Sequence, residues 1–348
     1  MKRCIYRYMT KNYYNVEDDI RTYPAAWLYV AYSARGSGKT YSFFRYCIEQ
    51  KKTFLYMKRT QIDIDLLSRE DFSPFKPLMR DHGWSIKTEK IYEGILRITK
   101  DEEVIGWCMA MSAVHKYKGF DLSEVKLMCL DEFIPQLTER VNRKEGELLL
   151  DLYMTVSRDR EARGQEPLKL CLFANATELY CPITETLGIV DPLAELNATG
   201  ADYYYLNDRR IMLHHIVDSV SAGEDTAIFA GMKGTQWADM AFGGTFSYND
   251  FSKVRKVSLN GFVPYVQVRY NRKDLYIYQH KSNGFYYMTT SRGKAEYFYD
   301  LEIESDQSAF YEDWVLALQR ELIDGNMAFK TYSMYNLIRN YKKIFKGA

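Results

Sequence analysis

Residues 33–40 read SARGSGKT, a glycine-rich segment that ends in a lysine and a threonine. The segment follows an apolar run and opens an aromatic stretch with helical periodicity, so the sequence predicts a strand, a loop and a helix. In such a phosphate-binding loop, backbone N–H groups surround a triphosphate, the lysine neutralises β- and γ-phosphate oxygens, and the threonine hydroxyl helps to hold Mg²⁺. The predicted nucleotide-binding residues here are Ser33, Ala34, Arg35, Gly36, Ser37, Gly38, Lys39 and Thr40.

The loop departs from the pattern G-x-x-x-x-G-K-[ST] at its first position, which is Ser33. A small residue is tolerated there if the loop keeps its curvature. Gly36 and Gly38 permit close approach of the backbone to phosphate and positive φ angles. The alternative interpretation is a surface turn that happens to have this sequence.

A second candidate site follows the apolar run VKLMCL at residues 125–130. Strands buried in a parallel sheet read as continuous hydrophobic runs, so Asp131 should lie at the carboxyl end of such a strand. Its carboxylate would bind Mg²⁺ through water, and Glu132 could polarise a water molecule for in-line attack on a γ-phosphate. A small-molecule kinase needs no such base, because its nucleophile belongs to the substrate. The pair therefore favours an NTP-hydrolysing motor or switch, with a solvated turn as the alternative.

Three further residues could act on the γ-phosphate. Asn175 follows a predicted strand next to the Asp131 strand, where a polar side chain can contact both the phosphate and the catalytic water; an Asx turn is the alternative. Arg158 ends the amphipathic segment 145–158. It could reach a neighbouring subunit's phosphates as an arginine finger, or serve as an ordinary cation at a helix C-terminus. Arg35, inside the loop, could reach the phosphate of its own subunit.

Several basic residues are candidates for contact with DNA or with a neighbouring subunit. Lys58 and Arg59 follow a predicted strand, and Lys118 lies in the segment KYKGFD. Both clusters should lie at one end of the sheet, where DNA could be contacted through its backbone. Arg160, two residues beyond Arg158, is grouped with them. Solvated surface charge is the alternative for each.

Composition limits the possible functions. The chain has 348 residues, enough for two or three domains, and its 47 basic and 46 acidic residues give a net charge of +1. Bulk electrostatics therefore give no argument for nucleic acid, and any basic surface must be local. The six cysteines form no CxxC pair, which indicates buried thiols in a reducing compartment and no metal other than Mg²⁺. No apolar segment is long enough to span a membrane and no signal peptide is present, so we expect a cytoplasmic protein.

The order of predicted elements is typical of a mostly parallel α/β sheet. Helices are predicted at 63–80 and 145–158, and the 30 tyrosines and 18 phenylalanines are expected mainly in the core. The predicted strands of the first domain are 27–31, 53–57, 104–109, 125–130, 169–173 and 210–216.

We expect three parts: an ATPase domain at 1–218, a glycine-rich linker at 219–247 with a short helix at 226–232, and a C-terminal α+β domain at 248–348. The last part carries 15 basic and 11 acidic residues. Its predicted elements are antiparallel strands at 253–258, 265–270, 275–279 and 284–290, then helices at 307–324 and 332–345.

Four motifs, in this order, resemble those of the double-stranded-DNA packaging ATPases of phi29-like bacteriophages. The chain has ARGSGKT at 34–40, LMCLDEF at 127–133, TVSRDRE at 155–161 and LFANA at 172–176. The family carries ARGxGK[ST], a hydrophobic strand ending in FDEF, an FRNRE-type helix end and an LSNA-type segment. The resemblance covers essentially the whole chain, and is strong in the first domain and weak beyond Asp218.

The resemblance implies an ASCE-type P-loop ATPase domain and a small C-terminal domain similar to an RNase H-like nuclease that has lost its nuclease carboxylates. It implies ATP and Mg²⁺ as ligands of Lys39, Thr40 and Asp131, with Glu132 as the catalytic carboxylate. Arg158 looks like the trans-acting arginine finger and Lys118 like a further trans-acting residue. Members of the family package viral DNA as a homo-oligomeric ring, usually a pentamer, on the portal and a packaging RNA. The implied place of action is the host cytoplasm during virion assembly.

Two departures from the family and three alternative functions stay open. Ser33 replaces a glycine, and the insertion GQEP at 164–167 lengthens the turn after Arg160. One alternative is a terminase large subunit with an active nuclease, which needs clustered carboxylates that the predicted strands 265–270 and 275–279 lack. The others are a monomeric P-loop kinase of small molecules, against which Glu132 argues, and a non-catalytic nucleotide-dependent scaffold. ATPase activity with and without double-stranded DNA, together with the mass in solution, separates these functions.

Overall fold

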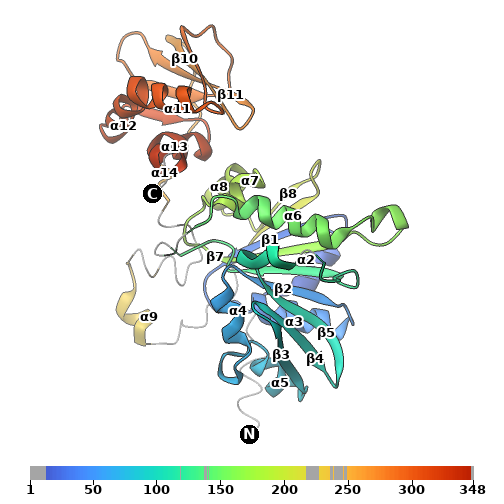
Figure 1. Cartoon of the computed structure of the whole chain (residues 1–348). Helices are drawn as coiled ribbons and strands as arrows, with labels where there is room; N and C mark the ends of the chain where they lie inside the picture. Colours follow the sequence, from blue (N-terminus) through green and yellow to red (C-terminus); the bar gives the residue numbers. More distant parts are fainter. Residues whose placement is uncertain are drawn as a thin grey trace. The chain divides into compact units, whose positions relative to one another are not determined.

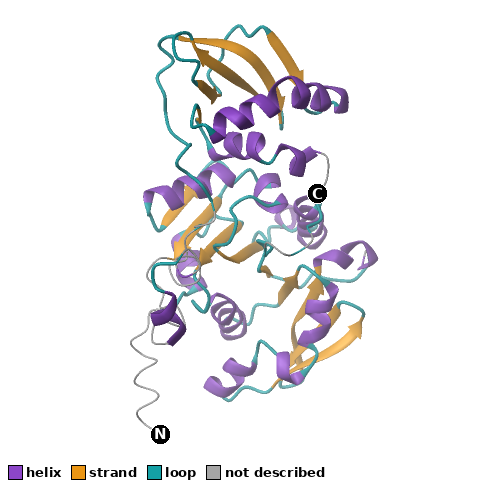
Figure 2. Cartoon of the chain, turned by 90° about the vertical axis from the view of Figure 1, so that its left-hand side faces the viewer, coloured by secondary structure: helices purple, strands orange, loops and turns teal. Residues whose placement is uncertain are grey.

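The computed structural model describes residues 13–117, 119–136, 139, 141–216, 227–235, 238, 246 and 249–345. The chain divides into two compact units, residues 1–249 and residues 250–348. The first is coloured from blue to yellow and the second from orange to red in Figure 1. Figure 2 shows that both units combine helices with strands. Each unit has a sheet and buried residues of its own.

A nine-stranded sheet forms the centre of the first unit. Its inner strands, from β5 to β9 in the order below, run parallel, and the strands at both edges are antiparallel to their neighbours. This confirms the mostly parallel α/β prediction. In sheet order the strands are β3 (Ile86–Tyr92), β4 (Ile95–Lys100), β5 (Glu103–Ala110), β2 (Phe54–Lys58), β6 (Leu127–Asp131), β7 (Lys169–Asn175), β1 (Leu28–Ser33), β9 (Ile211–Ile216) and β8 (Tyr203–Leu206).

Helices cover both faces of this sheet (Figure 1). One face packs against α2 (Val16–Thr22), α3 (Lys39–Glu49), α4 (Gln61–Leu67) and α5 (Lys76–His82), and the other carries α6 (Glu145–Ser157), α7 (Pro182–Thr186) and α8 (Val190–Thr199). The core under α3 is aromatic: the rings of Phe43 and Phe54 meet edge to face at 5.8 Å, and Phe44 lies 4.4 Å from Phe75. Such pairs stabilise a core beyond the area that they bury. The aromatic residues therefore fill the interior, as predicted.

The helix predicted at 63–80 is wrong as a single element. The chain instead forms α4, a 3₁₀ turn at Glu70–Phe72 and then α5. Thr60 starts α4 with a capping box to Asp63. Pro74 separates the 3₁₀ turn from α5, because proline lacks an N–H and restricts the residue before it. The helix predicted at 145–158 is present as α6.

The second unit has a five-stranded sheet, with helices before and after its last strand in the chain. Its central strands β10, β11 and β12 form the predicted antiparallel meander, while β13 and β14 add parallel strands at the two edges. The strand predicted at 253–258 is wrong, since only Val254 makes an isolated bridge there. The strands are β13 (Tyr297–Asp300), β10 (Phe262–Tyr270), β11 (Lys273–His280), β12 (Tyr286–Thr289) and β14 (Met327–Phe329).

Both helices predicted for the second unit are interrupted. The first consists of α11 (Glu304–Phe310), a π-helical turn at Tyr311–Val315 and α12 (Leu316–Ile323). The second consists of α13 (Tyr332–Arg339) and α14 (Tyr341–Phe345). Near the end of the first unit, the helix predicted at 226–232 is present as α9 (Ala227–Met232). Most of the predicted linker at 219–247 lies outside the described residues.

Candidate nucleotide-binding and hydrolysis site

The phosphate loop joins β1 to α3, as the sequence predicts. Gly36 and Gly38 have φ angles of 75° and 89°, a left-handed conformation that side chains disfavour. A Cβ atom at Gly38 would also lie 3.3 Å from the ring of Tyr13. The segment before α2 holds the loop from outside, because the N–H of Tyr14 donates to the carbonyl of Ser37 at 3.0 Å. Both glycines are therefore required by the backbone that the loop adopts.

Lys39 is buried at the start of α3, and its ammonium group points back into the loop. It donates to the hydroxyl of Ser33 at 2.5 Å and to that of Ser37 at 3.1 Å. The serine that replaces the family's first glycine thus provides an acceptor for the lysine. Burial lowers the pKa of Lys39 to about 8, although Asp131 and Glu132 act in the opposite direction. Lys39 is therefore a buried cation with few neutralising neighbours.

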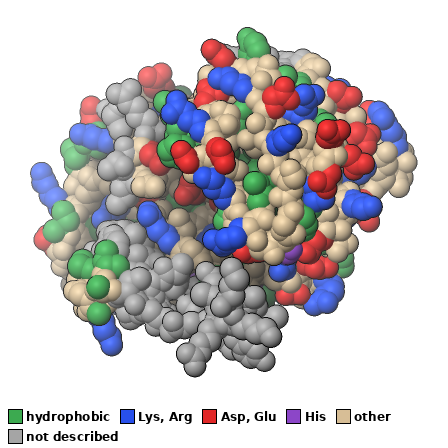
Figure 3. Space-filling view, turned by 90° about the horizontal axis from the view of Figure 1, so that it is seen from below, with side chains coloured by type: hydrophobic (Ala, Val, Ile, Leu, Met, Phe, Trp, Pro, Cys, Tyr) green, Lys and Arg blue, Asp and Glu red, His purple; other side chains and the backbone are tan. Residues whose placement is uncertain are grey.

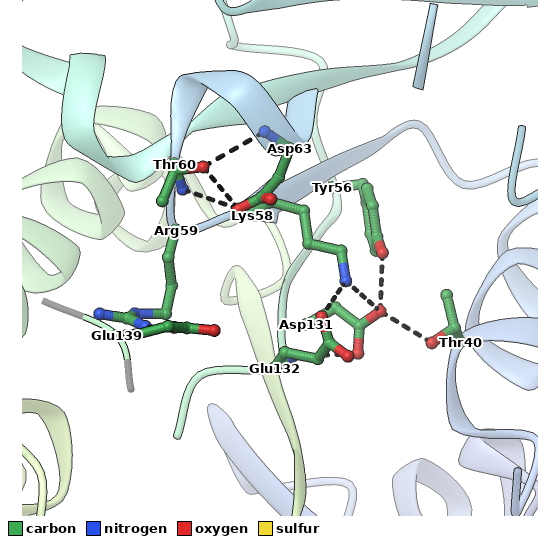
Figure 4. A network of polar contacts seen from close by, with 9 residues as sticks. All are labelled: Thr40, Tyr56, Lys58, Arg59, Thr60, Asp63, Asp131, Glu132 and Glu139. Atoms are coloured by element: carbon green, nitrogen blue, oxygen red, sulfur yellow. Dashed lines mark hydrogen bonds and ion pairs between the residues drawn. The ribbon is translucent and has the colours of Figure 1, made fainter. Parts of the chain in front are cut away.

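Asp131 accepts hydrogen bonds from three side chains at the carboxyl end of β6. Its carboxylate accepts from the hydroxyl of Thr40 at 2.9 Å, from that of Tyr56 at 2.7 Å and from the ammonium of Lys58 at 3.3 Å (Figure 4). Burial and Asp131 raise the pKa of Tyr56, which keeps its hydroxyl protonated as a donor. Hydroxyl and carboxylate oxygens are the ligands that Mg²⁺ prefers. The contact between Thr40 and Asp131 therefore suits the predicted magnesium site.

Glu132 has a backbone conformation that is uncommon for this residue type. Its φ angle is 57°, and its side chain is 57% exposed while that of Asp131 is 10% exposed. Left-handed backbone at a non-glycine residue costs free energy, which a functional site can retain when the surrounding structure fixes it. Glu132 donates its N–H to the Asp131 carboxylate at 3.1 Å. The two adjacent carboxylates thus lie in different environments, one buried and the other open to solvent.

The sheet order explains why these residues meet. Strands β2, β6, β7 and β1 are neighbours, so their carboxyl ends place Lys58, Asp131, Asn175 and Ser33 along one edge. Asn175 is directly opposite Ser33 in the register of β7 and β1. A hollow of about 400 Å³ opens over the loop, and a second of about 160 Å³ adjoins it. The residues that line both hollows are Arg35, Asp131, Glu132, Gln136 and Asn175.

Three of the basic residues predicted to contact DNA or a neighbouring subunit have partners within their own subunit. Lys58 lies in the nucleotide site, with its ammonium 2.8 Å from Glu132. Burial alone would lower the pKa of Lys58, but Asp131 and Glu132 together raise it. Arg59 is 7% exposed and paired with Glu139 and Glu145. Neither side chain is presented to a DNA backbone.

Arg160 is also buried, at 4% exposure. Its guanidinium donates to the carbonyls of Val125 and Ser123 at 2.5 and 3.0 Å. Arg160 therefore fixes the turn after α6 to the chain that leads into β6. Lys118, the other member of this group, lies outside the described residues. On the face in Figure 3, basic and acidic side chains are interleaved, so that face carries no field of one sign.

Arg158 lies at the opposite end of the sheet from the phosphate loop. Near the end of α6, the Tyr153 hydroxyl donates at 2.7 Å to the carbonyl of Leu168, which precedes β7. The helix begins beside Arg59 at the carboxyl ends of the strands and has 13 residues. A helix of that length spans about 20 Å. Arg158 is thus placed far from the nucleotide site of its own subunit.

The sequence did not indicate Tyr56 and Gln136, nor the contact of Lys58 with Asp131 and Glu132. A basic residue directly after a strand that neighbours the Asp131 strand was a usable signal for Lys58. Tyr56 and Gln136 belong to no motif. Within the described residues, no group of three or more His, Cys, Asp or Glu side chains could hold a metal. Cys47, Cys108, Cys129, Cys171 and Cys181 are buried and unpaired by disulfides, as predicted.

Comparison with protein families now identifies the chain. The model of the podovirus DNA encapsidation protein (Gp16) matches residues 9–308. The chain belongs to this family. The resemblance to the phi29-like DNA packaging family is therefore confirmed. None of the helices described for this DNA encapsidation protein is both long and apolar enough to cross a membrane.

Solved structures of packaging motors have the same fold as this DNA encapsidation protein. A chain of the bacteriophage Phi-29 viral genome packaging motor assembly is 16% identical, with a TM-score of 0.67 over 96% of this chain and 99% of that chain. A chain of the Phi-28 gp11 DNA packaging motor is also 16% identical, with a TM-score of 0.64 over 97% of this chain and 99% of that chain. Comparison with curated proteins gave no match.

Proposed function

We propose that this DNA encapsidation protein hydrolyses ATP at the carboxyl ends of β1, β6 and β7, and that hydrolysis drives viral double-stranded DNA into a procapsid. The observation that carries the proposal is the contact of Thr40 with Asp131, beside Glu132 and the glycine loop, in a polar hollow of about 400 Å³. A loop of this kind binds a triphosphate, and the adjacent carboxylates supply what hydrolysis requires.

The residues that hold the nucleotide follow from the geometry. Lys39 is buried within the loop and has only hydroxyl and carbonyl oxygens of the loop as hydrogen-bond partners, so a β- or γ-phosphate oxygen is a better acceptor than those that it has. Thr40 and Asp131 would hold Mg²⁺, the latter through water. When bound, the ion neutralises phosphate charge and polarises the γ-phosphoryl group.

Glu132 is the proposed general base. The oxygen of a water molecule bonds to the γ-phosphorus, the bond from that phosphorus to the β–γ bridging oxygen breaks, ADP leaves, and Glu132 accepts the proton of the water. Asn175, at the mouth of both hollows, would orient that water and contact the γ-phosphate. The ion pair between Lys58 and Glu132 must first break, because a carboxylate that is paired with an ammonium group is a weaker base.

Arg158 is the proposed arginine finger for a neighbouring subunit. Its position about one α6 length, about 20 Å, from the phosphate loop of its own subunit favours action in trans. A ring of identical subunits joined head to tail brings the finger end of one chain to the nucleotide end of the next. The family resemblance adds a pentamer and Lys118 as a second trans-acting residue to this proposal.

The second unit is proposed to bind DNA, the portal or a packaging RNA without cutting nucleic acid. Asp274 on β11 and Asp300 on β13 lie on either side of Arg269 on β10, whose guanidinium lies 3.1 Å and 3.8 Å from them. A cation of the protein therefore occupies the position between them, where two-metal cleavage would require carboxylates free to bind metal ions. This supports, but does not test, the prediction of a vestigial RNase H-like domain.

Two measurements test the proposed function together. Turnover of ATP is measured with and without double-stranded DNA, and the mass of the protein in solution is measured by size exclusion with light scattering. A DNA-stimulated ATPase with the mass of an oligomer is expected. A monomer that transfers phosphate to a small molecule, or a protein that binds ATP without turnover, would refute the proposal.

A further inference from the structure

Lys58 and Arg59 are adjacent in the sequence but contact different parts of the site. Lys58 reaches Asp131 and Glu132, whereas Arg59 turns away from them toward Glu139 (Figure 4). Arg59 also binds Glu145 through two contacts, Nε to Oε2 at 3.2 Å and Nη2 to Oε1 at 2.9 Å. Glu145 is the first residue of α6. Lys58, which pairs with the proposed base Glu132, is therefore joined by one peptide bond to Arg59, which pairs with the first residue of α6.

The pair formed by Arg59 and Glu145 is buried, with side-chain exposures of 6% and 12%. A guanidinium that makes two bonds to one carboxylate fixes its direction as well as its distance. Arg59 additionally pairs with Glu139, which lies in the chain between Glu132 and α6. Breaking such a pair leaves a buried charge without compensation. A shift of Arg59 is therefore expected to move the start of α6 with it.

The helix α6 is a continuous element of 13 residues that joins the partner of Arg59 to Arg158. Leu149, Leu152 and Val156 are buried along it. Its first turn packs closely on α7, because a Cβ atom at Gly146 would lie 2.7 Å from the carbonyl oxygen of Pro182. Arg158 follows its last residue. A displacement at the start of the helix is therefore carried to Arg158 at its end.

We infer that Arg59 is a positioning residue for Arg158. Through Arg59, the state of a subunit's own nucleotide site affects the position of the Arg158 that this subunit presents to its neighbour. The inference rests on the proposed trans role of Arg158. When Lys58 separates from Glu132, the end of β2 loses that contact, whereas Arg59 stays paired with Glu145 of α6. The consequence is that a nucleotide-dependent movement in one subunit sets the rate of hydrolysis in the next.

Mixed rings separate this role from a purely structural one. Arg59→Gln subunits keep Lys39, Thr40, Asp131 and Glu132, and Lys39→Ala subunits have a disabled site but an intact finger. Alone, Arg59→Gln rings should lose about 10²-fold in turnover, the loss that a misplacement of about 1 Å produces. Mixed with Lys39→Ala subunits, their sites receive well-placed arginines, and turnover per competent site should recover at least tenfold. Mixing is confirmed by the mass of differently tagged subunits.

Controls distinguish the failure of this inference from failure of the proposed function. Arg158→Ala mixed with Lys39→Ala must show the same recovery. If it does not, both the proposed trans role of Arg158 and the inference about Arg59 are refuted. Recovery in that control but none with Arg59→Gln means that Arg59 acts only within its own subunit, which overturns the inference alone. The exposed Arg21, paired with Asp18, gives a matched control in which Arg21→Gln changes nothing. If Arg59→Gln does not fold, Glu145→Gln removes the same pair from the helix side and must give the same recovery.

Discussion

The ammonium nitrogen of Lys58 lies 2.8 Å from a carboxylate oxygen of Glu132 and 3.3 Å from one of Asp131. The three residues come from the carboxyl ends of β2 and β6, which are paired in the sheet. The residue proposed to activate water is thus neutralised by a cation of its own subunit. Removing or engaging that cation is expected to change both stability and turnover.

Replacing Lys58 by methionine should destabilise the nucleotide-free protein. Lys58 and Asp131 have side-chain exposures of 15% and 10%, so the substitution leaves a largely buried carboxylate with fewer partners. The free energy of unfolding should fall by about 1–3 kcal/mol, measured by urea denaturation. Lys87→Met on the exposed strand β3 is the control and should leave the midpoint unchanged. An unchanged midpoint for Lys58→Met would show that solvent compensates for the lost pair.

Substitution of Glu132 by glutamine should separate binding from hydrolysis. The amide keeps the size of the side chain but cannot accept the proton of water, so phosphate release should fall by about 10²–10⁴-fold while ATP binding is retained. Lys39→Ala should instead lose binding. Phosphate release and the affinity for a fluorescent ATP analogue are measured on both variants. Near-normal turnover by Glu132→Gln would remove Glu132 from the role of base.

Nucleotide affinity should depend on pH through Lys39. Burial lowers the pKa of this lysine to about 8, so raising the pH from 7 to 9 deprotonates it and should weaken ATP binding. A bound triphosphate favours the charged form, so binding near pH 8 should take up a proton. Calorimetry in two buffers with different ionisation enthalpies measures this uptake. Lys39→Arg, which stays charged, should show none, and a wild-type affinity that is flat across this range contradicts the prediction.

The same pKa shift affects stability. The unfolded chain has the ordinary lysine pKa of 10.5 and the folded chain one of about 8. Between these values the unfolded state binds more protons, so this group favours folding increasingly as the pH rises through that window. The slope of unfolding free energy against pH should therefore be more positive in the wild type than in Lys39→Met. Equal slopes would indicate that Lys39 titrates normally.

Oligomers of mixed composition should reveal whether Arg158 acts in trans. Arg158→Ala subunits mixed with Lys39→Ala subunits should show more ATPase activity than the sum of the two separate variants, because a competent Arg158→Ala site can receive the intact arginine of a Lys39→Ala neighbour. A residue that acts only within its own subunit gives no activity above that sum. No recovery in oligomers shown to be mixed would return Arg158 to the role of a cation at the end of α6.

The second unit should bind nucleic acid or a partner without nicking DNA. Asp300 and Glu302, with Glu304 and Asp306 at the start of α11, form its densest acidic group, and carboxylates at that position stabilise a helix N-terminus. Full-length protein incubated with supercoiled plasmid in Mg²⁺ or Mn²⁺ should leave the plasmid intact, and binding should weaken steeply with salt. If the plasmid is nicked, and substituting these four carboxylates abolishes the nicking, the alternative function of a terminase with an active nuclease is favoured instead.

Local spacing alone determined much of this protein. A buried strand, a glycine loop and a helix are neighbours in the chain, so Gly36, Gly38 and Lys39 could be placed without knowledge of the rest of the fold. Asp131 could be placed at a strand end for the same reason, since continuous hydrophobic runs indicate covered parallel strands. Edge strands such as β3 were not predicted, because most of their residues are exposed and they lack that pattern.

Only the tertiary structure decided which of these residues meet. Thr40 and Asp131 are 91 positions apart and Arg59 and Glu145 are 86 apart, so their contacts depend on the order of strands in the sheet and on the path of α6. The burial of Arg59 and Arg160 could not be read from residue type, because a charged side chain is exposed by default and is buried only where partners offset its loss of hydration. Those partners are carboxylates and carbonyls from distant segments, which the fold alone brings within reach.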